Sequence, residues 1–159
     1  MDVGKYQAFA QQKLGVTFND IDLLVTAFTH RSYVNEHRKT AKEHNERLEF
    51  LGDAVLELVS TEYLYCNYDD PEGILTNWRS SLVRTESIGA AAARNEFEPL
   101  LRLSRGERRG TDRARAQILA NSYEAVVGAL YLDQGYDAAK DFITKTLLIT
   151  FDDILKTGS

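Results

Sequence analysis

Acidic residues recur at helical spacing inside an apolar stretch of this chain, and this segment, Asn45–Leu56, constrains the fold more than any other feature. At about 100° per residue, Glu46, Glu49 and Asp53 fall within roughly 60° of one another on a helix. The opposite side carries hydrophobic residues, namely Leu48, Leu51, Val55, Leu58 and Val59. The segment therefore predicts a helix that buries one face while its carboxylates converge on a shared space. Such oxygens are the ligands that hard divalent cations bind.

The same row of acids also fits an ordinary amphipathic helix with a solvated acidic face, which Glu57 would continue. Two features weaken that interpretation. Phe50 lies beside the acids instead of on the opposite face, and most residues from 48 to 59 are non-polar. A helix this apolar is usually buried, and buried carboxylates need partners because neighbouring like charges repel and raise one another's pKa. Spacing alone leaves both interpretations open.

A second segment supplies further oxygen donors. From Ala116 to Leu132, Glu124 is the only charged residue. Asn121 lies three positions earlier, so its amide oxygen and the Glu124 carboxylate can share one helical face. The alternatives are a helix whose single glutamate faces water, or an asparagine and a glutamate bonded to each other. If the two helices cross near Asp53 and Glu124, their oxygen-bearing side chains form a metal pocket.

Four stretches of the chain together resemble the nuclease domain of bacterial ribonuclease III, the endonuclease that cleaves double-stranded RNA. In chain order they are Thr29–Tyr33, Asn45–Leu56, Glu72–Thr76 and Ile118–Ala125. The second stretch is the hallmark of that family, and the others follow in the family's order and approximate spacing. The resemblance implies an all-α fold, that of the ribonuclease III endonuclease domain, which forms a homodimer.

The resemblance also assigns roles to individual residues. The positions that match the family's metal-binding residues are Glu49, Asp53, Asn121 and Glu124. Two further matching acids are associated with the scissile phosphate, so the expected catalytic set is Asp53, Glu124, Glu46 and Glu72. Phe50 matches an aromatic residue that packs across the family's dimer interface, which accounts for its position beside the acids.

Asn121 departs from the family pattern, which most often has Asp at this position. An amide oxygen still ligates a hard cation, but the lower anionic charge should weaken Mg²⁺ binding. We therefore expect a site that demands more Mg²⁺ or prefers Mn²⁺. The same departure keeps a second function open: a catalytically weakened nuclease fold that binds RNA or serves as a scaffold.

Water is the expected nucleophile, because no Ser, Cys or His is paired in a way that indicates covalent catalysis. Mg²⁺, or Mn²⁺ in its place, would lower the pKa of a bound water and offset charge in the transition state. The resemblance implies a metal-dependent endoribonuclease that hydrolyses double-stranded RNA, including ribosomal RNA precursors, to 5′-phosphate and 3′-hydroxyl ends. No organic cofactor is expected.

Composition agrees with one globular domain, since the chain has 159 residues of which 43% are hydrophobic. No apolar run approaches the length of a membrane span, so no membrane partner is expected. The single cysteine, Cys66, excludes an internal disulfide, fits the reducing cytoplasm and is expected to be buried. The formal charge of −5 is unexpected for an RNA-binding protein, so the distribution of charge must matter more than its total.

Six arginines concentrate positive charge between Arg102 and Arg115. Glycines and a lack of apolar periodicity predict a mobile loop here. Because the loop precedes the helix that carries Glu124, its arginines are predicted to hold duplex phosphates beside the metal, and the residues chosen for this role are Arg105, Arg108 and Arg109. An ordinary solvated loop is the alternative.

The rest of the chain reads as helix, with segments at 21–28, 75–83, 85–93 and, after a break at Gly135, 137–155. Asn19 is the expected cap of the first. Only 147–151 is β-branched enough to suggest a strand. His30 is expected to have a structural role at the end of its helix, whereas His37 and His44 are expected to be solvated.

The nuclease domain is expected to span residues 1–155. Residues 156–159 are expected to begin a linker to an absent double-stranded-RNA-binding domain. Without that second domain, much of the phosphate-binding surface is missing. We therefore expect a lone nuclease domain that dimerises but cleaves poorly at physiological salt.

Overall fold

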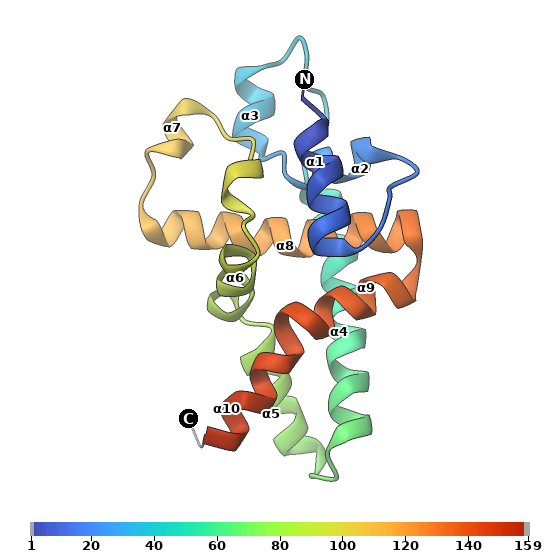
Figure 1. The fold of residues 1–159 in the computed structure, drawn as a ribbon. Helices are drawn as coiled ribbons and strands as arrows, with labels where there is room; N and C mark the ends of the chain where they lie inside the picture. The colour runs from blue at the N-terminus through green and yellow to red at the C-terminus, as the bar shows by residue number, and fades with distance from the viewer. Residues whose placement is uncertain (1, 158–159) are drawn as a thin grey trace.

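Two long helices, α4 (Glu46–Asn67) and α8 (Asp112–Gln134), cross at the centre of the computed structural model, which describes residues 2–157 (Figure 1). Every element assigned within that range is a helix, and an isolated bridge pairs Thr29 with Arg102. The predicted all-α fold is confirmed. No helix in the part of the chain that the structure describes is both long and apolar enough to cross a membrane.

The crossing is close because each long helix contributes a glycine to it. A Cβ atom on Gly52 would lie 1.7 Å from the carbonyl oxygen of Glu124, and one on Gly128 would lie 2.3 Å from the carbonyl oxygen of Leu48. Only residues without a side chain permit this approach of two backbones. The glycine pair thus fixes which turns of α4 and α8 face each other.

Shorter helices surround the crossing. They are α1 (Gly4–Phe9) with its π-helical continuation η1 (Ala10–Leu14), α2 (Ile21–Ala27), α3 (Arg31–Glu36), α5 (Glu72–Leu82), α6 (Thr85–Arg94), the 3₁₀ turn η2 (Glu98–Leu100), α7 (Arg105–Arg108), α9 (Tyr136–Ile143), the π-helical η3 (Thr144–Leu148) and α10 (Ile149–Thr157). Figure 1 shows α1 and α2 near one end of α4, while α5 runs alongside its other end. Helices α2, α6 and α9 all pack on α8.

Aromatic side chains form a continuous row through the core. Ring centroids lie 5.4 Å apart for Phe9 and Phe28, 5.1 Å for Phe28 and Phe97, 6.1 Å for Phe97 and Tyr123, and 5.2 Å for Tyr123 and Phe142. All five rings are buried. Such tilted and stacked pairs stabilise the fold beyond the area they bury. The row anchors the inner face of α8.

The helical segments predicted from periodicity are confirmed, with corrections at their ends. The cap of α2 is Asp20, whose side chain accepts a hydrogen bond from the Asp22 amide, so the prediction of Asn19 was wrong. Asn19 instead donates its backbone N–H to Asp133 at 2.9 Å. Helix α5 begins at Glu72, earlier than predicted, because it starts directly after Pro71. Residues 147–151 are helical and contain no strand.

Two further predictions need comment. Cys66 is an exposed free cysteine, so its predicted burial was wrong; it lies in the last turns of α4, where the helix extends away from the crossing. Helix α10 reaches Thr157, two residues past the predicted end of the domain at 155. The last two residues of the predicted linker, 158 and 159, lie outside the described residues.

Candidate active site

Acidic side chains from both long helices meet at the glycine crossing. Glu49 and Asp53 lie one turn apart on α4, and Glu124 lies on α8 at the turn whose carbonyl contacts Gly52. Glu49 and Glu124 are partly buried, whereas Asp53 is exposed. The structure therefore brings together three of the predicted site residues, of which Glu124 lies about seventy positions after the other two in the sequence.

Burial raises the pKa values of two of these carboxyl groups. Burial raises the pKa of Glu124 from 4.5 to about 9, assisted by a hydrogen bond with Asp53 and by the negative charges of Asp53 and Glu49. Burial also raises the pKa of Glu49, with the charges of Glu46 and Asp53 acting in the same direction. Within residues 2–157, no salt bridge joins Glu49, Asp53 or Glu124 to a basic side chain. Negative charge is thus concentrated here without a protein cation.

The neighbouring acids of α4 are neutralised by arginines. The Arg31 Nε donates to the Glu46 Oε2 at 2.8 Å, and this hydrogen bond lowers the pKa of Glu46. The Arg79 Nε lies 3.2 Å from the Glu57 Oε1. The acidic row therefore divides: its ends are paired with cations, whereas its middle faces α8 unpaired. A uniformly solvated acidic face does not describe this helix.

Asn121 lies one turn before Glu124 on α8, as predicted, but its oxygen is already engaged. The Oδ1 of Asn121 accepts a hydrogen bond from the Gln117 Nε2 at 2.9 Å. Asn121 is therefore bonded one turn back along α8, and the predicted alternative of a bond to Glu124 is not what forms. To act as a ligand, this oxygen has to exchange Gln117 for the ion.

The oxygen-bearing side chains at the crossing are chemically suited to a hard divalent cation, although they are not arranged around one point. Among the described residues, no group of three or more His, Cys, Asp or Glu side chains is placed to hold one metal ion. The oxygens that converge are nevertheless of the kind that Mg²⁺ and Mn²⁺ prefer. Burial, and after it the charges of neighbouring carboxylates, raise the pKa values of Glu49 and Glu124, and a bound cation would oppose both effects. The residues could hold the ion by drawing their carboxylates inward.

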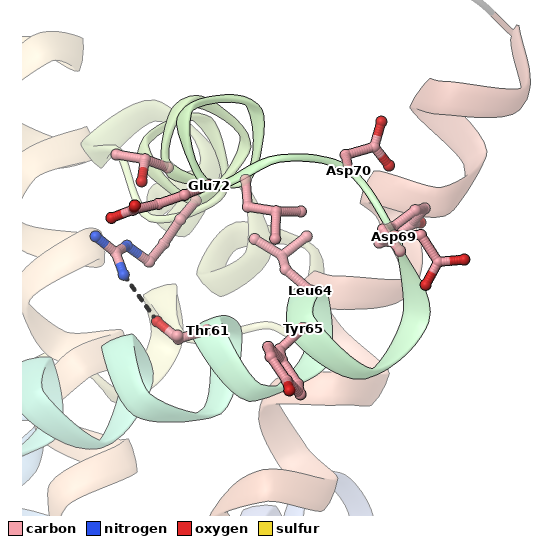
Figure 2. A pocket seen from close by; sticks show the side chains of 10 residues that line it. Thr61, Leu64, Tyr65, Asp69, Asp70 and Glu72 are labelled. Atoms are coloured by element: carbon pink, nitrogen blue, oxygen red, sulfur yellow. Dashed lines mark hydrogen bonds between the residues drawn. The ribbon is translucent and has the colours of Figure 1, made fainter.

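Glu72 does not join this acid cluster within one chain. It lies at the start of α5 and lines a cavity of about 650 Å³ beside the C-terminal half of α4 (Figure 2). Thr61 and Tyr65 line the same cavity. Arg79 closes one side of it, where its Nη1 donates a hydrogen bond to the Thr61 Oγ1 at 3.0 Å. Because Thr61 follows Asp53 by eight residues, the cavity lies roughly 12 Å farther along α4 than the acid cluster.

Phe50 projects from α4 into solvent. Its side chain is 83% exposed, and Leu58 and Tyr65 are 57% and 79% exposed. Residues 50, 54, 58, 61 and 65 follow one another at helical spacing, so they form one outward stripe. We call this stripe the α4 face. Phe50 is thus exposed in the single chain, and its packing against a partner subunit stays a prediction.

The arginine segment is more ordered than predicted. Residues 105–108 form the short helix α7, whose cap is Ser104, and α8 already begins at Asp112. Part of the positive charge is structural: Arg115 pairs with Glu98, and the Arg108 Nη2 donates to the Leu101 carbonyl at 3.1 Å. The prediction of a loop over the whole segment was wrong, because residues 105–108 and 112–115 are helical.

The three arginines predicted to contact RNA differ in whether their guanidinium groups already form hydrogen bonds within the protein. Within residues 2–157, the side chains of Arg105 and Arg109 make no hydrogen bond or salt bridge, whereas that of Arg108 is bonded. Both free arginines are exposed. Of the three chosen residues, these two have guanidinium groups available for a ligand.

Sequence reasoning missed the role of Asn45, which directly precedes α4. Its side chain is buried, and its Nδ2 donates to the Ala27 carbonyl at 3.1 Å while its backbone N–H donates to the Thr29 carbonyl at 2.9 Å. The pairing of Arg31 with Glu46 was missed as well. The signal for both contacts was the Thr29–Tyr33 motif, because it contains Thr29 and Arg31, but the sequence did not indicate what these residues contact.

Comparison with known proteins agrees with this arrangement. Residues 20–151 match the family model described as Ribonuclease-III-like. The chain is 48% identical over 136 residues to ribonuclease 3 of Latilactobacillus sakei, and 52% identical over 134 residues to ribonuclease 3 of Oceanobacillus iheyensis. These matches cover 85% and 84% of this chain but only 59% of each relative, so the chain spans less than two thirds of their length.

Solved structures show the same fold. The nuclease domain of ribonuclease III from Campylobacter jejuni matches with a TM-score of 0.77 and 34% identity, covering 87% of this chain and 91% of that one. A second structure of that nuclease domain, described as flexible in a region involved in dimer formation, has a TM-score of 0.76 and 35% identity, covering 87% and 96%. By sequence and by fold, this chain belongs to the ribonuclease III-like family and corresponds to its nuclease domain.

Proposed function

We propose that this chain is the catalytic domain of a metal-dependent endoribonuclease that hydrolyses double-stranded RNA to 5′-phosphate and 3′-hydroxyl ends. The observation that carries the proposal is the convergence of Glu49, Asp53 and Glu124 at the glycine crossing, where none of the described basic side chains forms a salt bridge with them. Membership of the ribonuclease III-like family supports an endonuclease. Processing of ribosomal RNA precursors is the proposed cellular role.

The site residues would have different roles, which follow from their different surroundings. Glu49, Asp53, Asn121 and Glu124 would hold Mg²⁺, or Mn²⁺ in its place, which supplies activation of water and charge neutralisation at the scissile phosphate. Because burial raises the pKa of Glu124, its carboxyl group would have to lose a proton before it could act as a ligand. Glu46 is held by Arg31 at the first turn of α4, where it can orient the phosphate or the attacking water.

We also propose that two copies pair along the α4 face. An antiparallel pairing of two α4 helices about a two-fold axis near Glu57 would set residue 50 of one copy opposite residue 64 of the other. Phe50 would then cover the cavity that Leu64 and Tyr65 line, which accounts for its exposure. The dimer formation described for the C. jejuni nuclease domain supports association of two copies.

The same axis gives Glu72 a role that it lacks in one chain. Residue 61 would lie opposite residue 53, so the partner's Glu72, which lines the cavity beside Thr61, would approach Asp53. Each acid cluster would then be completed by a carboxylate from the other copy. This supports the predicted membership of Glu72 in the catalytic set.

The experiment is incubation of the purified chain with a perfect RNA duplex in Mg²⁺, in Mn²⁺ and in EDTA, with end-group analysis of the products. We expect metal-dependent cleavage that leaves 5′-phosphates. Glu124→Gln should abolish cleavage, whereas Glu86→Gln, which changes an exposed glutamate on α6 paired with Arg84, should not. Cleavage in EDTA, or an active Glu124→Gln protein, would contradict the proposal.

One observation favours a second function. Asn121 replaces a charged ligand, and Gln117 occupies its oxygen. A catalytically silent RNA-binding or scaffold protein would bind the duplex yet leave it intact at every Mg²⁺ and Mn²⁺ concentration. The same experiment therefore distinguishes the two functions.

A further inference from the structure

The segment that joins α2 to α3, residues 27–32, is attached to both acid-bearing helices. The Ala27 carbonyl accepts hydrogen bonds from the Asn45 Nδ2 at 3.1 Å and from the Ser122 Oγ at 3.2 Å. The Thr29 carbonyl accepts the Asn45 backbone N–H at 2.9 Å. Asn45 precedes α4, and Ser122 lies between Asn121 and Glu124 on α8. This segment, which we call the 27–32 hub, is thus fixed relative to the acid cluster.

The other side of the 27–32 hub holds the arginine segment. The Arg102 N–H donates to the Phe28 carbonyl at 2.8 Å, and the His30 N–H donates to the Arg102 carbonyl at 3.0 Å. Two residues on, the Ser104 N–H donates to the Ser32 Oγ at 3.0 Å. The hub therefore connects the acid cluster to the residues that begin α7.

The Ser32 hydroxyl is oriented by His30. The His30 Nδ1 accepts the Ser32 N–H at 3.1 Å and lies 2.8 Å from the Ser32 Oγ. Because the His30 Nδ1 accepts the Ser32 N–H, it is unprotonated, so the Ser32 hydroxyl is the donor in its contact with this nitrogen while its oxygen accepts the Ser104 N–H. Burial lowers the pKa of His30 and so favours that neutral form. Imidazole, hydroxyl and amide form one chain of hydrogen bonds.

Helix α7 depends on such anchors for its position. It has four residues, too few for a helix to persist without support. Besides the bond to Ser32, the Arg105 N–H donates to the Glu36 Oε2 at 3.2 Å, and the Ser104 Oγ accepts the Glu107 N–H at 3.1 Å. Of these contacts, the one from Ser32 links α7 to the hub.

We propose that Ser32, oriented by His30, is a positioning residue that holds Arg105 and Arg109 at a set distance from the acid cluster, so that these arginines bind duplex phosphates in register with the scissile bond. The inference rests on the proposed function, because it deepens the role of the arginine segment in RNA binding. It assigns a purpose to the Thr29–Tyr33 motif, which the acid cluster alone leaves unused.

The test compares steady-state cleavage of an RNA duplex by three serine variants. Ser32→Ala removes the acceptor, and we expect KM to rise about fivefold, the size of one lost hydrogen bond, with kcat changed less than about twofold. Ser32→Thr keeps the hydroxyl and should restore KM. Ser80→Ala is the matched control, because its hydroxyl bonds only the Thr76 carbonyl on α5, and it should leave KM unchanged.

A double-mutant cycle separates positioning from general stability. In the Arg105→Ala/Arg109→Ala background, Ser32→Ala should raise KM no further, since the arginines through which Ser32 acts are gone. His30→Asn keeps an acceptor oxygen near the Nδ1 position and should resemble wild type, whereas His30→Ala should resemble Ser32→Ala. This second pair tests the inference even if Ser32→Ala fails to fold.

The outcomes separate this inference from the proposed function. If the wild-type chain cleaves no duplex in Mg²⁺ or Mn²⁺, the proposed function fails and the inference fails with it. If the wild type cleaves but Ser32→Ala leaves KM unchanged, or adds its full effect in the arginine-free background, the inference alone is overturned. A parallel loss of kcat and melting temperature without a change in KM would also overturn it.

Discussion

At the scale of single residues, Glu124 carries the strongest electrostatic perturbation near the acid cluster. Its carboxyl group is driven toward the protonated form by burial, by its hydrogen bond with Asp53 and by the charge of Glu49. Without a cation, ionisation of this group is less favourable in the folded protein than in the unfolded chain, so it destabilises the fold. The residue that should bind metal most directly is therefore also the one that should destabilise the metal-free fold at high pH.

This predicts the pH dependence of stability in EDTA. Glu124 has a pKa of about 9 when folded against 4.5 for an ordinary glutamate. Between these values the folded state retains a proton that the unfolded chain has released, so the free energy of unfolding falls as pH rises. Thermal melting from pH 6 to pH 9 should show this decline. Glu124→Gln should flatten it, and saturating Mg²⁺ should reduce it; curves of equal slope for wild type and variant would contradict the prediction.

Asn121 gives a second prediction at this scale. Asn121→Asp adds an anionic ligand and should lower the Mg²⁺ concentration for half-maximal cleavage by roughly tenfold, because ligand charge sets the affinity for hard cations. Gln117→Ala frees the Asn121 oxygen and should shift the curve in the same direction by less. A titration of cleavage rate against Mg²⁺ measures both. Superimposable curves for wild type and Asn121→Asp would remove the argument.

At the scale of secondary-structure elements, the site depends on how closely α4 approaches α8. The backbones touch at Gly52 and Gly128, and the carboxylates on the next turns are within reach of one another for that reason. Side-chain packing on the inner face of α8 then holds the crossing, since Tyr123, buried next to Glu124 in sequence, donates or accepts a hydrogen bond with Thr146 at 2.7 Å.

The glycine crossing therefore predicts a selective loss of stability. Gly52→Ala and Gly128→Ala place a methyl group inside a backbone contact and should each lower the free energy of unfolding by about 1–3 kcal/mol or more. Gly73→Ala on α5 is the control, because a Cβ there meets nothing within 4 Å, and alanine is the better helix former. Urea unfolding compares the three. Equal midpoints would show that the helices separate without penalty.

How far the sequence predicts the fold follows from the range of the forces involved. Helical periodicity is local, so the acid-bearing helices and the residues Glu49, Asp53 and Glu124 could be predicted from it. The crossing at Gly52 could not be predicted, because the residues around a glycine in the sequence do not indicate which distant segment packs against it. Helix α7 escaped prediction for a related reason: its order comes from Ser104 and from contacts with α3. The family resemblance supplied Glu72, which no spacing argument connects to the other acids.

At the scale of the whole molecule, one chain leaves two features unexplained. Phe50 is exposed on the α4 face, and Glu72 lies a distance along α4 from the acids it is predicted to join. A single antiparallel pairing of two copies answers both. The proposed pairing would also join the two acid clusters into one assembly, as the proposed cleavage of opposite strands of a duplex requires.

The pairing makes a prediction about mixed dimers that a monomeric enzyme cannot meet. Glu72→Gln and Glu124→Gln should each weaken or abolish cleavage as homodimers. In a mixed dimer of the two, one cluster combines the intact Glu124 of its own chain with the partner's Glu72. Mixing the two variants should therefore give mixed dimers that each have up to half of the activity of a wild-type dimer. Adding Phe50→Asp to both chains should prevent this rescue and shift the protein to monomers in sedimentation velocity, whereas Leu132→Asp, at an exposed leucine on α8, should do neither. If Glu72 acts within its own chain, every cluster in the mixed dimer lacks one acid, and no activity returns.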